Sequence, residues 1–197
     1  MRMSRDRQVA QKGIAAVELA LILPLLLVMV FGIIDFGRLV QARLIVTNVS
    51  REGGSLVSRK DKSVPVAEID EVINMLQASG TPLDLNGLGR IYVWRIAAGT
   101  SQSSPNPSID TRLQRSRGSL AVSSSIGSSL PRLGLSDALY QHLRFEGSPQ
   151  NTSDIAEVWV VESFYKYKPI TPLPRFISNL LITPGYDGRI ISSKSVF

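Results

Sequence analysis

The sequence predicts an α+β protein in which a long N-terminal helix precedes a small domain built on an antiparallel or mixed sheet. Three observations support this fold class. An apolar run occupies residues 14–34, and two later stretches, 90–96 and 155–167, have the composition or the alternation of β-strands. We expect a leader at 1–13, a transmembrane and amphipathic helix at 14–54, and an α+β domain at 55–197.

The apolar run has the length of a membrane span. It holds 21 residues from Ile14 to Ile34, and Glu18 is its only charged residue. At about 1.5 Å per residue the run reaches roughly 30 Å, which matches the hydrocarbon core of a bilayer. A charge at mid-membrane costs about 2.5–3.5 kcal/mol on insertion, and less near the interface. Glu18 therefore calls for a compensating role.

A basic leader precedes this run. Its 13 residues carry four basic side chains and one acidic side chain, a net charge of +3. Positive flanking charge keeps that end of a span in the cytoplasm. A secretory signal peptide is one interpretation, but its apolar core is normally about 7–15 residues long, and no A-x-A-like site follows this run. The alternative is cleavage before the run, between Gly13 and Ile14.

Several blocks of residues carry a family resemblance. Gly13 stands before an apolar residue, and Glu18 is fifth after it, as at a type IV prepilin processing site. A Leu-Pro step follows at Pro24, then FGIIDFGR at 31–38 and REG at 51–53. Over residues 11–57 the chain resembles the TadE-like family, the pseudopilins of the tight-adherence (Flp) pilus system. Leu19, where the family more often has an aromatic residue, and the Gly54-Ser55 pair after REG are small departures.

The resemblance implies a processing and assembly role for the start of the run. A prepilin peptidase would cut after Gly13, which has no side chain and fits a narrow cleft. The new α-amine of Ile14 would be largely positive at neutral pH. Glu18 lies one helical turn further on and can pair with this amine or with that of a neighbouring subunit. A glutamate near a helix start is also favoured by the helix dipole alone.

The helix is expected to continue beyond the bilayer. Pro24 predicts a kink, because proline lacks a donor and its ring opposes the carbonyl of Ala20. After Ile34, apolar residues recur at three- and four-residue steps, which predicts an amphipathic segment packed on a soluble domain. The Gly53-Gly54 pair predicts the stop, giving a helix of about 35–40 residues from Ile14, roughly 55 Å long. The resemblance marks six motif residues in this segment: Phe36, Gly37, Arg38, Arg51, Glu52 and Gly53.

The remaining residues predict a small folded domain that resembles the general pilin plan. Helices are expected at 66–78 and at 136–145, the second with Ser136 as its N-cap. Strands are expected at 90–96, at 155–167 in the centre of the sheet, and at 189–197. Residues 99–119 predict an exposed loop, 119–129 fit no single state, 176–181 suggest a helical turn, and 147–153 and 187–188 are turn signals.

No residue pattern indicates an enzyme. The chain has no cysteine, and its one histidine, His142, is expected on a surface or in packing. Nucleophile, phosphate-loop and metal-ligand motifs are missing, so we expect no metal and no cofactor. Arg112, Arg115 and Arg117 could contact a polyanion, but a solvated loop is the favoured interpretation and nucleic acid is not an expected partner.

The sequence thus predicts a non-enzymatic minor pilin or pseudopilin. The resemblance implies a role in assembling a tight-adherence pilus that supports adherence and biofilm formation. Its expected partners are the major pilin, a sister pseudopilin, the prepilin peptidase, the inner-membrane pilus platform and the lipid bilayer. We expect it in the bacterial inner membrane, with its N-terminus in the cytoplasm and its C-terminal domain in the periplasm, or in the surface pilus. The alternative is a single-pass membrane-anchored binding or adhesive protein that never enters a pilus.

Overall fold

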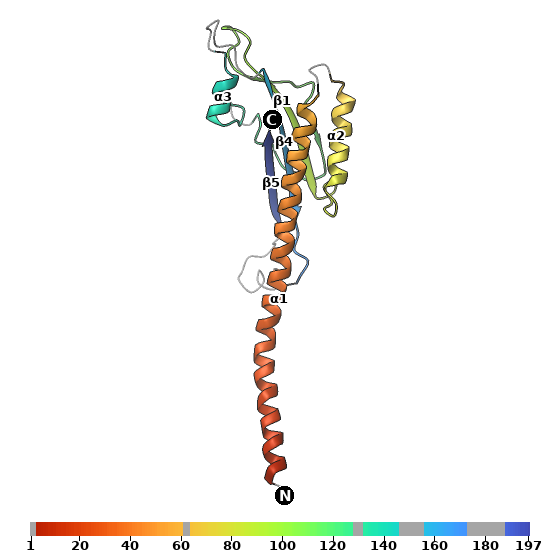
Figure 1. The fold of residues 1–197 in the computed structure, drawn as a ribbon, viewed down its shortest axis with the longest axis vertical. Helices are drawn as coiled ribbons and strands as arrows, with labels where there is room; N and C mark the ends of the chain where they lie inside the picture. The colour runs from red at the N-terminus through yellow and green to blue at the C-terminus, as the bar shows by residue number, and fades with distance from the viewer. Residues whose placement is uncertain (1–2, 61–63, 128–131, 146–155, 173–187) are drawn as a thin grey trace. The chain divides into compact units, whose positions relative to one another are not determined.

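A computed structural model describes residues 3–60, 64–127, 132–145, 156–172 and 188–197, with side chains from residue 15 onward. These residues form three helices and five strands, which confirms the predicted α+β class (Figure 1). The elements are α1 (Met3–Ser58), α2 (Val66–Ser79), β1 (Gly89–Ala97), β2 (Ser108–Ile109), β3 (Arg115–Arg117), α3 (Asp137–Leu143), β4 (Glu157–Tyr167) and β5 (Arg189–Val196).

The chain divides into two compact units. The first contains residues 1–41 and 168–188, and the second contains residues 42–167 and 189–197. In the first unit every residue of α1 from Ala15 to Val30 is exposed. A helix that is apolar all round and unburied fits a single-pass membrane anchor, because lipid can cover the surface that no protein covers.

The second unit is built on an antiparallel sheet with the strand order β2-β1-β4-β5, and β3 also pairs with β1. β4 pairs with β1 from Gly89↔Tyr165 to Ala97↔Glu157, and with β5 from Val160↔Val196 to Tyr167↔Arg189. The prediction that β4 lies in the middle of the sheet is therefore confirmed. Its side chains are buried on both faces, which explains why apolar residues occur at both odd and even positions along it.

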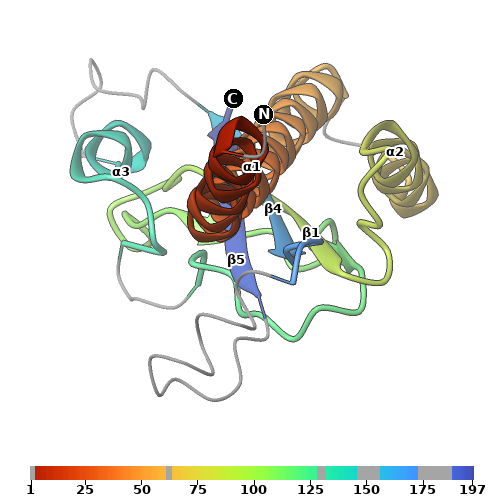
Figure 2. The ribbon, with the colours of Figure 1, turned by 90° about the horizontal axis from the view of Figure 1, so that it is seen from below.

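The C-terminal part of α1 and the whole of α2 lie side by side along one face of this sheet (Figure 2). α1 contributes Ala42, Val46, Val49 and Val57 to the buried core, and α2 contributes Ile69, Val72, Ile73 and Leu76. The opposite face carries a second cluster, in which Trp94, Ile96, Val158 and Val160 of the strands meet Tyr140 and Leu143 of α3. The central strands are thus covered on both sides.

The short helices and the last strand follow the sequence closely. α2 and α3 lie where they were predicted, and the Ser136 side chain accepts a hydrogen bond from the Leu139 backbone N–H at 3.4 Å, as an N-cap does. The predicted turn segments at 147–153 and 176–181, and Asp187, lie outside the described residues.

Two predictions are wrong. Residues 99–119 are not simply an exposed loop, because β2 and β3 pair with β1 there and Leu113 is completely buried. The helix does not stop at Gly53-Gly54 but continues to Ser58, so it has 45 residues counted from Ile14 rather than 35–40, and 56 counted from its start at Met3. It also runs through Pro24 without ending, and the kink there stays a prediction.

Candidate functional site

The predicted processing site lies within α1. Gly13, Ile14 and Glu18 belong to one continuous helix, and the Glu18 side chain is exposed. None of the side chains from residue 15 onward that the structure describes forms an ion pair or hydrogen bond with Glu18. Its carboxylate is therefore available for a partner, and pairing with an amine at Ile14 stays a prediction.

Asp35, the first charged residue after the apolar run, fixes a distant segment of the chain to α1. Its Oδ1 accepts hydrogen bonds from the backbone N–H of Ile170 at 3.1 Å and of Thr171 at 3.3 Å. The Thr171 hydroxyl donates to Oδ2 of the same carboxylate. One carboxylate thus satisfies two backbone donors and one hydroxyl, which is the arrangement that strengthens hydrogen bonds through charge.

The residues after Asp35 point away from the protein. The Phe36 side chain is 67% exposed, and Arg38 is exposed as well. A methyl group at Gly37 would meet no atom within 4 Å. None of these three motif residues is buried among the described residues, so their surface is open to lipid or to another molecule.

The second motif block has an outer and an inner half. Arg51 and Glu52 are exposed, whereas Gly53 and Gly54 are buried. A methyl group at Gly53 would lie 2.7 Å from Leu76 Cδ1 and 3.0 Å from Val161 Cγ1, and one at Gly54 would collide with the ring of Phe197. These glycines allow α1 to approach α2 and β4 closely. That requirement explains why the helix passes through them instead of ending there.

Two serines, Ser50 and Ser163, form hydrogen bonds between α1 and β4. The Ser163 hydroxyl on β4 donates to the Val46 carbonyl of α1 at 2.9 Å, and Ser50 Oγ also lies 2.9 Å from that carbonyl oxygen. The two hydroxyl oxygens are 2.5 Å apart. Both serines are fully buried, so this small polar cluster fixes the position of α1 along β4.

Comparison with known families gives a match, which covers most of α1. Residues 13–55 match the family model described as TadE-like protein. This part of α1 is similar to TadE-like proteins, and we call residues 13–55 the TadE-like segment. The match confirms the resemblance predicted from the sequence, and it includes both motif blocks and the proposed cleavage site. Comparison with curated proteins and with solved structures gives no match.

The TadE-like segment therefore has three structurally different parts in this chain. Its first part, up to Ile34, is an exposed apolar helix with Glu18 near its start. Its middle part presents Phe36 and Arg38 outward while Asp35 holds residues 170–171. Its last part packs on the sheet through Gly53 and exposes Arg51 on the other side. The sequence marked the motif residues, but it gave no sign of the Asp35 contact.

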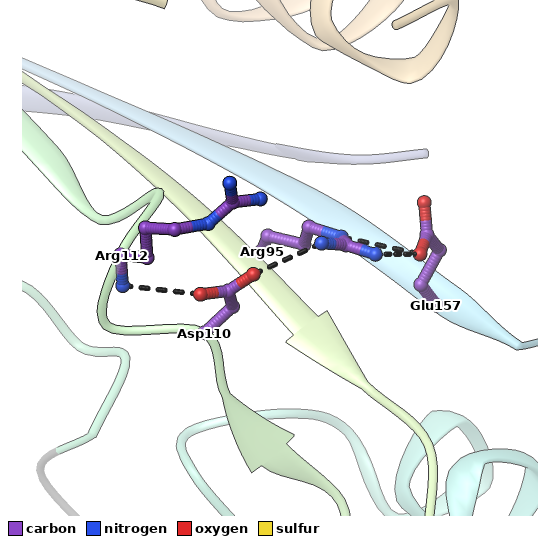
Figure 3. A network of polar contacts seen from close by, with 4 residues as sticks. All are labelled: Arg95, Asp110, Arg112 and Glu157. Carbon is purple, nitrogen blue, oxygen red and sulfur yellow. Dashed lines mark hydrogen bonds and ion pairs between the residues drawn. The ribbon is translucent and has the colours of Figure 1, made fainter. Parts of the chain in front are cut away.

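The buried Arg95 joins neighbouring segments of the sheet unit and has a structural role. Arg95 Nη1 donates to Asp110 Oδ2 at 2.9 Å, and its Nε donates to Glu157 Oε2 at 3.1 Å (Figure 3). The Arg95 side chain is 10% exposed, and both carboxylates are partly covered. Asp110 also accepts from the Arg112 backbone N–H, so the cluster ties the segment after β2 to β1 and β4.

Glu162 is the second buried charge among the residues that the structure describes. It accepts hydrogen bonds from the hydroxyls of Ser124 and Ser125, and Lys194 lies opposite it on β5. Residues 119–127, the described part of the segment 119–129 that fitted no single state in the sequence, are held to the sheet by these serines. Neither cluster resembles a reaction centre, and the described residues contain no group of three or more side chains that could hold a metal ion.

The three arginines of the predicted basic patch do not act together. Arg115 Nε lies 3.5 Å from Asp70 Oδ1 of α2, and Arg117 hydrogen-bonds Asn74 of the same helix. These contacts attach β3 to α2. They favour a structural role for the two arginines over a binding site for a polyanion. His142 is exposed in the last turn of α3, as expected for a surface residue.

Proposed function

We propose that this protein is a minor pilin or pseudopilin needed to assemble a tight-adherence (Flp) type IVb pilus, and that it is not an enzyme. The observation that carries the proposal is the TadE-like segment at residues 13–55. In that segment a glycine precedes an exposed apolar helix whose one carboxylate, Glu18, has no partner among the described side chains. Such a helix is suited first to a bilayer and then to other subunits.

In this proposal residues 1–13 are a cytoplasmic leader that a prepilin peptidase removes. Hydrolysis of the peptide bond after Gly13 consumes one water, leaves a carboxylate on the leader and frees the α-amine of Ile14. Glu18 then pairs with this amine or with that of a neighbouring subunit, which reduces the cost of burying both charges. Residues 14–54 would form the helix whose apolar part spans the inner membrane and whose amphipathic part continues beyond it, and residues 55–197 would form the periplasmic domain that supports adherence and biofilm formation.

The partners follow from the same proposal. The exposed helix would contact the lipid bilayer before assembly, and the major pilin and a sister pseudopilin after it. The inner-membrane pilus platform would receive the processed subunit. The outward-facing motif residues Phe36, Arg38, Arg51 and Glu52 support these contacts, because nothing in the described chain covers them.

Processing is tested by mass spectrometry of protein extracted from membranes of cells that contain the peptidase. We expect the mature chain to begin at Ile14 and the Gly13→Ala variant to remain as the precursor. Gly32→Ala is the matched control, because a methyl group there meets no atom within 4 Å. An intact N-terminus in the unmodified protein, or normal maturation of Gly13→Ala, would contradict the proposed site.

Assembly is tested with Glu18→Leu. Removing one partner of a buried ion pair costs about 3–5 kcal/mol, so incorporation should fall on the order of a hundredfold or more. The variant should still be processed and retained in the membrane. Met29→Leu, an apolar exchange in the same span, is the control. The measurement is the amount of subunit in sheared surface pili. Unchanged incorporation of Glu18→Leu would contradict the pairing role of Glu18, whereas absence of the unmodified protein from the pili would favour a permanently anchored adhesive protein.

A further inference from the structure

The segment that Asp35 holds has a fixed height relative to the apolar helix. Asp35 directly follows Ile34, the last residue of the apolar run. Its carboxylate bonds the backbone N–H groups of Ile170 and Thr171 at 3.1 and 3.3 Å. Both partners belong to the first compact unit, and Figure 1 shows this segment beside α1. Residues 168–171 therefore lie at the level where the helix leaves the hydrocarbon core.

This level is the headgroup layer of a bilayer. A bilayer is about 40–45 Å thick including headgroups and about 30 Å thick without them, which leaves roughly 5–7 Å on each side. Arg38 follows Asp35 by three residues, so it lies on the same side of the helix and about 4.5 Å further out. Its guanidinium can therefore reach lipid phosphates while Asp35 stays near the core boundary.

The side chains at this level have the chemistry of an interfacial anchor. Ile170 is 60% exposed and Phe36 is 67% exposed, although both lie next to fixed backbone. Arg38 and Lys168 are exposed cations of the same unit. Aromatic and apolar residues with nearby basic side chains are typical of membrane–water interfaces.

We propose that Asp35 clamps residues 168–171 against α1 to form an interfacial collar, and that this collar binds the headgroup region of anionic phospholipids. Ile170 enters the boundary between headgroups and acyl chains, and Arg38 pairs with a lipid phosphate, for which its planar guanidinium is suited. The inference depends on the membrane anchor within the proposed function. It does not depend on cleavage or on pilus assembly, so it can fail while those succeed.

The absence of cysteine from the chain makes a site-specific test possible. Ile170→Cys in the full chain is labelled with an environment-sensitive fluorophore and reconstituted in nanodiscs that contain lipids spin-labelled near the headgroup. We expect strong quenching at position 170. Met75→Cys on α2, which replaces a side chain of similar exposure in the second unit, is the matched control and should stay unquenched.

The clamp and the lipid class are tested in the same system. Asp35→Ala should abolish most of the quenching at position 170, because it removes the acceptor for all three donors. Replacing anionic by zwitterionic lipid, or Arg38 by Gln, should reduce the quenching in nanodiscs with the clamp intact. Equal quenching at positions 75 and 170, or no effect of Asp35→Ala, would overturn the proposal. Quenching that is independent of both lipid charge and Arg38 would overturn the headgroup assignment.

Discussion

Gly37 and Gly53 are both helical glycines of the TadE-like segment, and the structure gives them different purposes. A methyl group at Gly53 would press on Leu76 and Val161, whereas one at Gly37 meets no atom within 4 Å. Gly53 is therefore required by packing within the chain. Gly37 is not, so any need for its small size must come from lipid or from a neighbouring molecule.

This difference predicts different effects of one substitution. Alanine is favoured over glycine in a helix by about 1 kcal/mol, and this gain is common to both sites. Overpacking a core costs about 1–3 kcal/mol, and this cost falls on Gly53→Ala alone. Tryptophan fluorescence reports the sheet unit, which contains Gly53 but not Gly37. In denaturant unfolding of the full chain followed by this signal, we expect Gly53→Ala to be destabilised by the overpacking cost less the helix gain, and Gly37→Ala to unfold as the unmodified protein does. No loss of stability in Gly53→Ala would show that α1 can shift away from α2 at a cost no larger than the helix gain.

Arg95 predicts an asymmetry between buried and exposed ion pairs. Arg95→Met leaves Asp110 and Glu157 without their shared cation. Removing a partner from a buried pair costs about 3–5 kcal/mol, and because both carboxylates are partly exposed we expect the lower end of that range.

The control for this prediction is Arg132→Met. Its ion pair with Asp137 is largely exposed, at 59% and 71% of the two side chains. Exposed pairs contribute about 0–1 kcal/mol, so this variant should unfold almost as the unmodified protein does in the same denaturant titration. If Arg95→Met loses as little unfolding free energy as Arg132→Met, the Arg95 cluster is solvated in solution.

At the scale of elements, the sequence predicted what depends on long regular patterns. The apolar run and the steps after Ile34 predicted α1, β-branched and aromatic residues predicted β1, and alternating side chains predicted β4 and β5. These patterns persist over seven residues or more, so packing reinforces the local preference. β2 and β3 have two and three residues, too few for an alternation to show, and they form because β1 offers unpaired backbone groups.

The misread elements share a physical cause. Gly53-Gly54 has the composition of a helix stop, but the tight approach to Leu76 and Phe197 decides its role, and that contact involves residues far away in sequence. The Asp35 clamp binds Ile170 and Thr171, which follow Asp35 by 135 and 136 positions in the sequence. Arg95 and Glu162 did leave a signal, since each is a charge inside a strand with apolar neighbours. Their partners, however, come from segments without any regular pattern.

At the scale of the whole molecule, the two compact units depend on different solvents. The sheet unit is held by its buried core, including Trp94 and Trp159, the chain's two tryptophans. The helix of the first unit exposes its apolar residues and has its own hydrogen bonds. In a bilayer such a helix stays folded, because unpaired backbone groups in hydrocarbon cost several kcal/mol each.

We therefore expect unfolding in two stages when the full chain in lipid nanodiscs is titrated with urea. Tryptophan fluorescence reports the sheet unit alone, because both tryptophans belong to it, and should show one complete transition. Far-ultraviolet circular dichroism should keep a residual helical signal from the span after that transition. Gly53→Ala should shift the first transition to lower urea and leave the residual signal unchanged, because Gly53 belongs to the sheet unit. Complete loss of helical signal together with the tryptophan signal would show that the two units unfold as one.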